Sequence, residues 1–251
     1  MNTLSWLLTL ALVLWLLLGE PLLGRASHRR MLAALDRGDP NARLRFYRSW
    51  TAQGWLLAAV TLAICLVNGW SWPQLGLTAP HALGDMATGI LAGVMLGLLL
   101  GPLLGVLLAR RKRQRHIKPR TLPVAGGDKV LRMLPQGRRE RLAFALLAIT
   151  AGLTEELIWR GFGTILLQTL WPHWPQLLTI GVLAVAFGWA HLYQGGLGML
   201  FTGLLGGLLA ALYLASGSLW LPMLLHVLID LRALLIPIPA EHLPAQAASK
   251  A

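Results

Sequence analysis

The chain has 251 residues, of which 56% are hydrophobic and only 13% are charged, and it contains 27 glycines. An ordinary globular domain is about 45–50% apolar and about 25% charged, so this composition excludes a soluble domain and a disordered chain. The single cysteine, Cys65, excludes a disulfide scaffold. The composition predicts an all-α protein, a polytopic transmembrane helix bundle.

The 22 lysines and arginines give a formal net charge of +12, which in a soluble protein would suggest a nucleic-acid partner. Nearly all of them lie in two stretches between apolar runs, residues 25–48 and residues 110–141. Cytoplasmic loops of membrane proteins are enriched in Lys and Arg. We therefore expect no nucleic-acid partner, and two cytoplasmic loops that contact the anionic head groups of the lipid bilayer.

Apolar segments long enough to cross a membrane recur along the chain, since a hydrocarbon core of about 30 Å takes about 20 helical residues. We predict about seven spans, with six or eight as alternatives. The first is expected to stop at Glu20-Pro21, because proline interrupts a helix. The predicted spans cover residues 4–19, 50–67, 83–109, 142–170, 177–192, 197–214 and 219–236.

The chain divides into three parts on this pattern. Residues 1–139 are expected to hold the first three spans and the two basic loops, residues 140–236 the other spans, and residues 237–251 a short tail. With the N-terminus outside, both basic loops fall in the cytoplasm. Glycines are dense in the third and sixth spans, where small residues are expected to let helices pack closely.

Few ionisable side chains lie inside the predicted spans, and most are in the last four. A charged group at the bilayer centre costs at least about 2.5–3.5 kcal/mol on insertion scales, which makes such residues functional candidates. One more, Arg232, is expected to extend to the lipid head groups from the end of its span. The candidates are Glu155, Glu156, Arg160, His191, His226 and Asp230.

The spacing of these residues suggests separate roles. Glu156 and Arg160 are four residues apart and are expected to form an ion pair on one helix face. Glu155 is turned by about 100° from Glu156, so it is free to face a cavity. His226 and Asp230 share a face in the same way, and Asp230 is expected either to orient His226 or to contact substrate.

A glutamate and two histidines in an apolar cavity fit the hydrolysis of a peptide bond by activated water. The carboxylate would act as general base with one imidazole, and the other imidazole would stabilise the oxyanion. Glu155, His191 and His226 could also hold Zn²⁺, although the zinc-protease pattern H-E-x-x-H is absent. The alternative reading of Glu156 with Arg160 is a structural ion pair, and of each histidine a hydrogen-bonding link between helices.

At these residues the sequence resembles the CPBP family of intramembrane proteases, the CAAX proteases and bacteriocin-processing enzymes also called the Abi family. Its motifs E-E-x-x-x-R, F-x-x-x-H and H-x-x-x-N or D are matched in order by Glu155 to Arg160, Phe187 to His191 and His226 to Asp230. The resemblance covers residues 140–236 and points to bacterial members. It implies an enzyme of the bacterial inner membrane whose substrate is a peptide or protein at the membrane.

The resemblance also implies roles for single residues. Glu155 would be the base, His191 would hold the water, and His226 with position 230 would support the oxyanion, while Arg160 would orient the glutamates. Eukaryotic CAAX proteases carry Asn where this chain has Asp230. An ionised Asp only accepts hydrogen bonds, so Asp230 is either protonated or orients His226.

Two other functions stay open: a non-catalytic scaffold with the same fold, and a proton-coupled transporter, since Glu, His and Asp chains also relay protons. One expectation conflicts with an enzyme. If the fourth span starts at Leu142, Glu155 lies about 20 Å deep, whereas His191 is expected near the cytoplasmic end of the next span.

Overall fold

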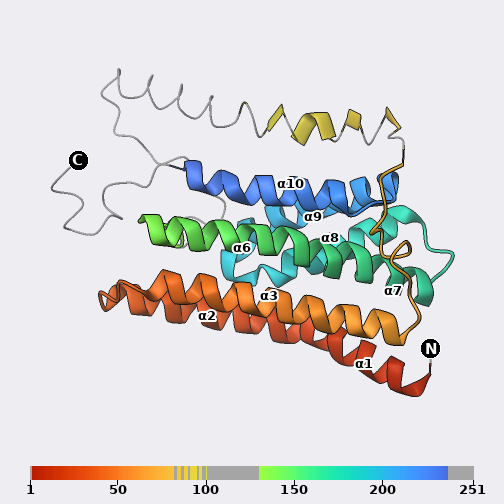
Figure 1. Ribbon diagram of the computed structural model, residues 1–251, viewed down its shortest axis with the longest axis horizontal. Helices are drawn as coiled ribbons and strands as arrows, with labels where there is room; N and C mark the ends of the chain where they lie inside the picture. Colours follow the sequence, from red (N-terminus) through yellow and green to blue (C-terminus); the bar gives the residue numbers. More distant parts are fainter. Residues whose placement is uncertain are drawn as a thin grey trace.

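The computed structural model describes residues 2–81 and 130–236, together with residues 84, 85, 88, 89, 91–94, 96, 97 and 100. These residues are mostly helical, and no strand occurs among them. The long helices run side by side in an up-and-down bundle (Figure 1). The prediction of an all-α helix bundle is confirmed.

The helices fall into two groups along the chain. The N-terminal group consists of α1 (Thr3–Leu14), a π-helical segment (Trp15–Gly19), α2 (Glu20–Asp36) and α3 (Ala42–Val67). The C-terminal group consists of α6 (Arg138–Glu156), a π-helical segment (Leu157–Phe162), α7 (Gly163–Leu170), α8 (Gln176–Ala190), a 3₁₀ turn (Leu192–Gln194), α9 (Gly195–Ser216), α10 (Trp220–Leu231) and a 3₁₀ turn (Arg232–Leu235).

Among the residues that the structure describes, four continuous helical stretches are long and apolar enough to cross a membrane, and the chain is an integral membrane protein. They are Thr3–Asp36, Ala42–Val67, Arg138–Leu170 and Leu192–Ser216. The apolar helices α8 and α10 are shorter, with 15 and 12 residues. The predicted third span, residues 83–109, lies mostly outside the described residues, so the count of about seven stays a prediction.

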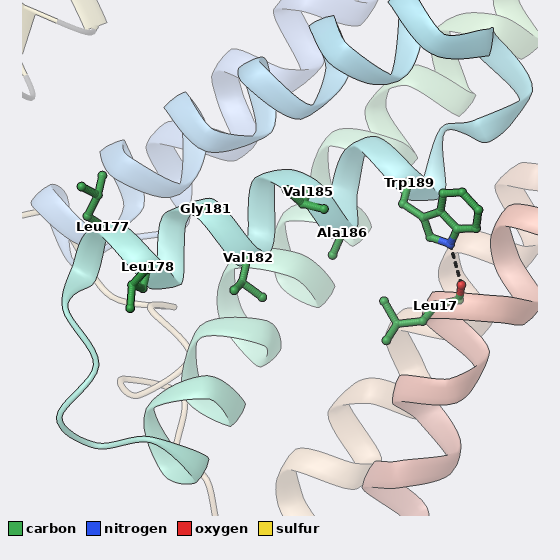
Figure 2. Close-up of a pocket in the computed structure, with 8 residues that line it drawn as sticks. All are labelled: Leu17, Leu177, Leu178, Gly181, Val182, Val185, Ala186 and Trp189. Atoms are coloured by element: carbon green, nitrogen blue, oxygen red, sulfur yellow. Dashed lines mark hydrogen bonds between the residues drawn. The ribbon is translucent and has the colours of Figure 1, made fainter.

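The first helix does not stop at Glu20-Pro21, and that expectation is wrong. Proline has no backbone N–H, so the carbonyl of Leu17, four residues earlier, loses its usual helical donor. The indole Nε1 of Trp189 on α8 supplies one, at 2.7 Å (Figure 2). The π-helical segment just before Glu20 also changes the hydrogen-bond register there, so the helix continues through Pro21 to Asp36.

The first basic stretch is likewise more helical than expected. Instead of a long loop, residues 25–48 form the end of α2, a short turn and the start of α3. The buried Arg43 donates to the carbonyl of Arg132 at 2.8 Å and lies 3.7 Å from Glu140 of α6. The α2–α3 turn, the start of α6 and the end of α10 lie at one end of the bundle (Figure 1).

Helices α8 and α9 form a closely packed hairpin. A Cβ atom added at Gly188 would lie 2.6 Å from the carbonyl oxygen of Met199, and one at Gly203 would lie 3.0 Å from that of Ala184. Only glycine allows the two backbones to approach this closely. The predicted packing role of glycine in the sixth span is therefore seen at Gly203.

The length of α8 resolves the conflict over depth. Its 15 residues span about 22 Å, less than the hydrocarbon core, so the helix ends inside the bundle and His191 follows at that level. The neighbouring stretch Arg138–Leu170 is much longer, at 33 residues, and Glu155 lies near its middle. The two side chains therefore reach one level, with His191 Nε2 4.0 Å from Glu155 Oε2.

Candidate active site

A buried ion pair forms the base of the site. Arg160 Nη1 donates to Glu156 Oε1 at 2.8 Å, and both side chains are at most 1% exposed. Arg160 Nη2 donates to the carbonyl of Gly206 on α9 at 3.0 Å. The predicted pair between Glu156 and Arg160 is therefore present, and it also ties the π-helical segment Leu157–Phe162 to α9.

The ring of Phe187 on α8 brings the cation and the two histidines together. The guanidinium carbon of Arg160 lies 4.2 Å from the centre of this ring, a cation–π contact. The ring centre of His191 lies 4.7 Å away and that of His226 lies 6.0 Å away. Side chains from three separate motifs thus surround one aromatic ring.

His226 on α10 is held between two carboxyl groups. Its Nδ1 lies 2.7 Å from Glu156 Oε1, and because a carboxylate oxygen accepts, Nδ1 donates. Its Nε2 lies 3.7 Å from Asp230 Oδ2, which is beyond hydrogen-bond distance. Glu156 thus accepts hydrogen bonds from both Arg160 and His226, and Asp230 lies beside the second ring nitrogen.

Glu155 and His191 form a second, more open pair. The Nδ1 atom of His191 donates to the carbonyl of Phe187 at 2.9 Å, which leaves Nε2 as an acceptor in the neutral ring. This Nε2 lies 4.0 Å from Glu155 Oε2, and the two side chains are 14% and 28% exposed. Two acceptors at this separation are too far apart for a direct bond and suitably placed for one bridging water.

These contacts do not fit the zinc site considered from the sequence. Glu155 and His191 face each other, whereas His226 directs Nδ1 to Glu156 and Nε2 towards Asp230. Within residues 2–81 and 130–236, no three His, Cys, Asp or Glu side chains are grouped so that they could hold a metal ion. The expected ligand set of Glu155, His191 and His226 is therefore not assembled.

Residues 138–232 match the model of a protein family described as type II CAAX prenyl endopeptidase, Rce1-like. This segment is similar to that family, and the match is consistent with the resemblance to CAAX proteases seen in the sequence. The match indicates a membrane-embedded protease of the CAAX type, and the Rce1-like segment contains all six predicted site residues. None of the curated proteins and none of the solved structures compared with the chain matches it.

One acidic residue near the site was missed, and it lies outside the Rce1-like segment. Glu20 of α2 lines the same small pocket as Glu155, between α2, α3 and α6. The predicted stop at Glu20-Pro21 puts both residues at a helix end, and therefore at the membrane surface. An acidic residue directly after an apolar run of 16 residues was the signal that could have placed it inside the bundle.

A second cavity lies apart from the Rce1-like site. It is an apolar groove of about 500 Å³ between α8 and the first helix, with Trp189 and Leu17 at one end (Figure 2). None of the six predicted site residues lines it. Trp189 is two residues from His191, on nearly the opposite side of the helix from Phe187.

Proposed function

We propose that this protein is an intramembrane endopeptidase that hydrolyses a peptide bond with water activated by Glu155 and His191. The observation that carries the proposal is the pairing of these two acceptors across 4.0 Å from separate helices. The resemblance to CAAX proteases in the matched segment supports the same activity.

The separation of the two acceptors determines how a bridging water would be oriented. A water between them donates one hydrogen to the Glu155 carboxylate and the other to Nε2 of His191. Its oxygen lone pairs then point away from both groups, towards a substrate carbonyl carbon. As the new C–O bond forms, Glu155 takes the proton, and it later delivers that proton to the leaving nitrogen as the C–N bond breaks.

The second histidine would act on the carbonyl oxygen. With Nδ1 donating to Glu156, a doubly protonated His226 has Nε2–H left to donate to the oxyanion of the tetrahedral intermediate. Asp230 lies beside that nitrogen, so we assign it the orientation of His226 rather than direct donation. Glu156 and Arg160 hold the imidazole in place and do not touch substrate.

Two single substitutions test the proposal. Glu155→Gln and His191→Ala should each lower the cleavage of membrane-inserted peptides by at least about a hundredfold, the usual contribution of a general base. The assay uses purified protein in lipid vesicles with a peptide library, and mass spectrometry reports cleavage. Full activity of both variants would exclude this mechanism. A wild-type protein that cleaves no peptide would leave the scaffold and the transporter, and uptake driven by a pH gradient would then distinguish those two.

Whether the reaction uses a zinc ion can be tested independently. Because the three side chains do not converge on one point, we propose a glutamate mechanism without a zinc ion. Elemental analysis of the active, purified protein should find less than one zinc per chain, and chelators should leave cleavage unchanged. Zinc bound in equal proportion to the protein, and lost together with activity, would overturn this part.

We further propose that the arginine-bearing end of the bundle lies in the cytoplasm and contacts anionic lipid head groups, with the N-terminus outside. Figure 1 places the α2–α3 turn and the start of α6 at one end and the N-terminus at the other. A concentration of arginine at one membrane face is typical of the cytoplasmic side. Exposed arginines at this end are Arg25, Arg29, Arg30, Arg37, Arg45, Arg48, Arg138, Arg139 and Arg141.

A further inference from the structure

A small pocket of about 40 Å³ lies between α2, α3 and α6, next to the water-activating pair. One water needs about 10–15 Å³ of such space, so the pocket has room for two or three. The pocket is too small for a substrate side chain. The residues that line it include Glu20, Thr150, Thr154 and Glu155.

The polar atoms in this pocket lack enough protein partners. One oxygen of Glu20 and one of Glu155, Oε2 in each case, are fully buried and have no hydrogen-bond partner among the described residues. Leaving a buried polar atom without a hydrogen-bond partner is unfavourable. Polar groups of this kind are commonly satisfied by ordered water, which typically makes about three hydrogen bonds.

Glu20 lies on the first helix, outside the matched family segment. Contacts between that helix and the segment fix its position. Trp189, at the end of α8, donates to the carbonyl that Pro21 leaves free on Leu17. That bond holds the first helix against α8 one turn before Glu20. The same helix continues beside the turn after α8, where a Cβ atom added at Gly24 would lie 3.8 Å from the ring of Tyr193.

We propose that the Glu20 pocket is a water-holding site that supplies the nucleophile to Glu155, and that Glu20 is a positioning residue of the reaction. The inference rests on the proposed function. A protease inside a bilayer must draw water from a medium that excludes it, and each turnover consumes one water. A polar pocket beside the base keeps the next water within reach.

The first test replaces Glu20 by an apolar and by a polar residue of similar size. Glu20→Leu should lower kcat by about tenfold or more, the effect of losing one or two hydrogen bonds to the water, and leave KM within about twofold. Its melting temperature should be equal or higher, because a buried unpaired carboxyl group is removed. Glu20→Gln, which still binds water, should keep most of the activity. Asp36→Leu, at the exposed end of the same helix, is the control.

The second test uses a pair of threonines in the same local setting. Thr154 and Thr61 are both buried, and each hydroxyl donates to the carbonyl four residues earlier at 2.8 Å. Only Thr154 lines the pocket. Thr154→Val should lower kcat about five- to tenfold with KM unchanged, and Thr61→Val should leave kcat unchanged.

The outcomes separate this proposal from the proposed function. An active Glu155→Gln variant would end the proposed function itself. An inactive Glu155→Gln variant together with wild-type kcat in Glu20→Leu and Thr154→Val would overturn only the water-holding site. Loss of activity in Glu20→Leu and Glu20→Gln with a matching fall in melting temperature would mean that Glu20 acts through stability, and would overturn it too. If Glu20→Leu fails to fold, Thr154→Val against Thr61→Val decides.

Discussion

Arg160 contacts three different groups inside the bundle. It neutralises Glu156, donates to the Gly206 carbonyl and lies over the Phe187 ring. Its planar guanidinium can reach all three groups in a fixed geometry, which a lysine ammonium cannot. The buried carboxyl group of Glu156 therefore has a cationic partner in a place where an unpaired charge would be very costly.

Removing this cation should destabilise the fold. Arg160→Met leaves Glu156 with His226 as its single partner, and breaking a buried pair in this way costs about 3–5 kcal/mol. Reversible unfolding of the protein in detergent micelles measures the loss. The double variant Glu156→Gln with Arg160→Met should regain part of it, because no unpaired charge remains. A single variant as stable as wild type would contradict the structural role given to the pair.

Contacts within a helix could be predicted from the sequence, and contacts between helices could not. The pair of Glu156 with Arg160 follows from a spacing of four, because helix geometry is local. The hydrogen bond from His226 to Glu156 joins residues 70 positions apart, and no periodicity encodes that separation. The position of Glu20 was missed for a related reason: the partner that satisfies the carbonyl freed by Pro21 comes from a distant helix.

At the scale of helices, the α8–α9 hairpin determines where His191 lies. Its two backbones touch at Gly188, three residues before the histidine. The turn at Leu192–Gln194 ends α8 after 15 residues, at the level of Glu155. Hydropathy located both helices but not the level at which they turn.

An added methyl group at the crossing should separate the pair. In Gly188→Ala the new Cβ would lie 2.6 Å from the Met199 carbonyl, so α8 must move and carry His191 away from Glu155. We expect cleavage to fall by at least about tenfold, since misplacement by about 1 Å can cost a hundredfold. Gly181→Ala on the same helix, where nothing lies within 4 Å, is the control. Equal activity of the two variants would show that the crossing does not position the site.

At the scale of the molecule, the distribution of arginine predicts how the bundle sits in its membrane. The helices cross with their arginine-rich turns at one end and the N-terminus at the other (Figure 1). Because Cys65 is buried and is the one cysteine of the chain, a cysteine-free background requires a single substitution.

Labelling of new cysteines checks this orientation. In that background, Asn41→Cys in the α2–α3 turn should react with a membrane-impermeant maleimide only after intact cells are opened. His173→Cys in the turn before α8 should react from outside. Both positions lie in turns between helices, so access depends on the side of the membrane. The reverse pattern would invert the proposed topology and place the arginines outside.

The hydrogen bond between Trp189 and the Leu17 carbonyl links the family segment to a helix that the family does not define. Chimaeras that exchange the N-terminal helices between related proteins would therefore exchange one wall of the reaction chamber as well. If the exchanged first helix lacks the residues equivalent to Glu20 and Pro21, the chimaera should insert and fold but cleave its substrate slowly. Restoring those two residues alone should recover the rate.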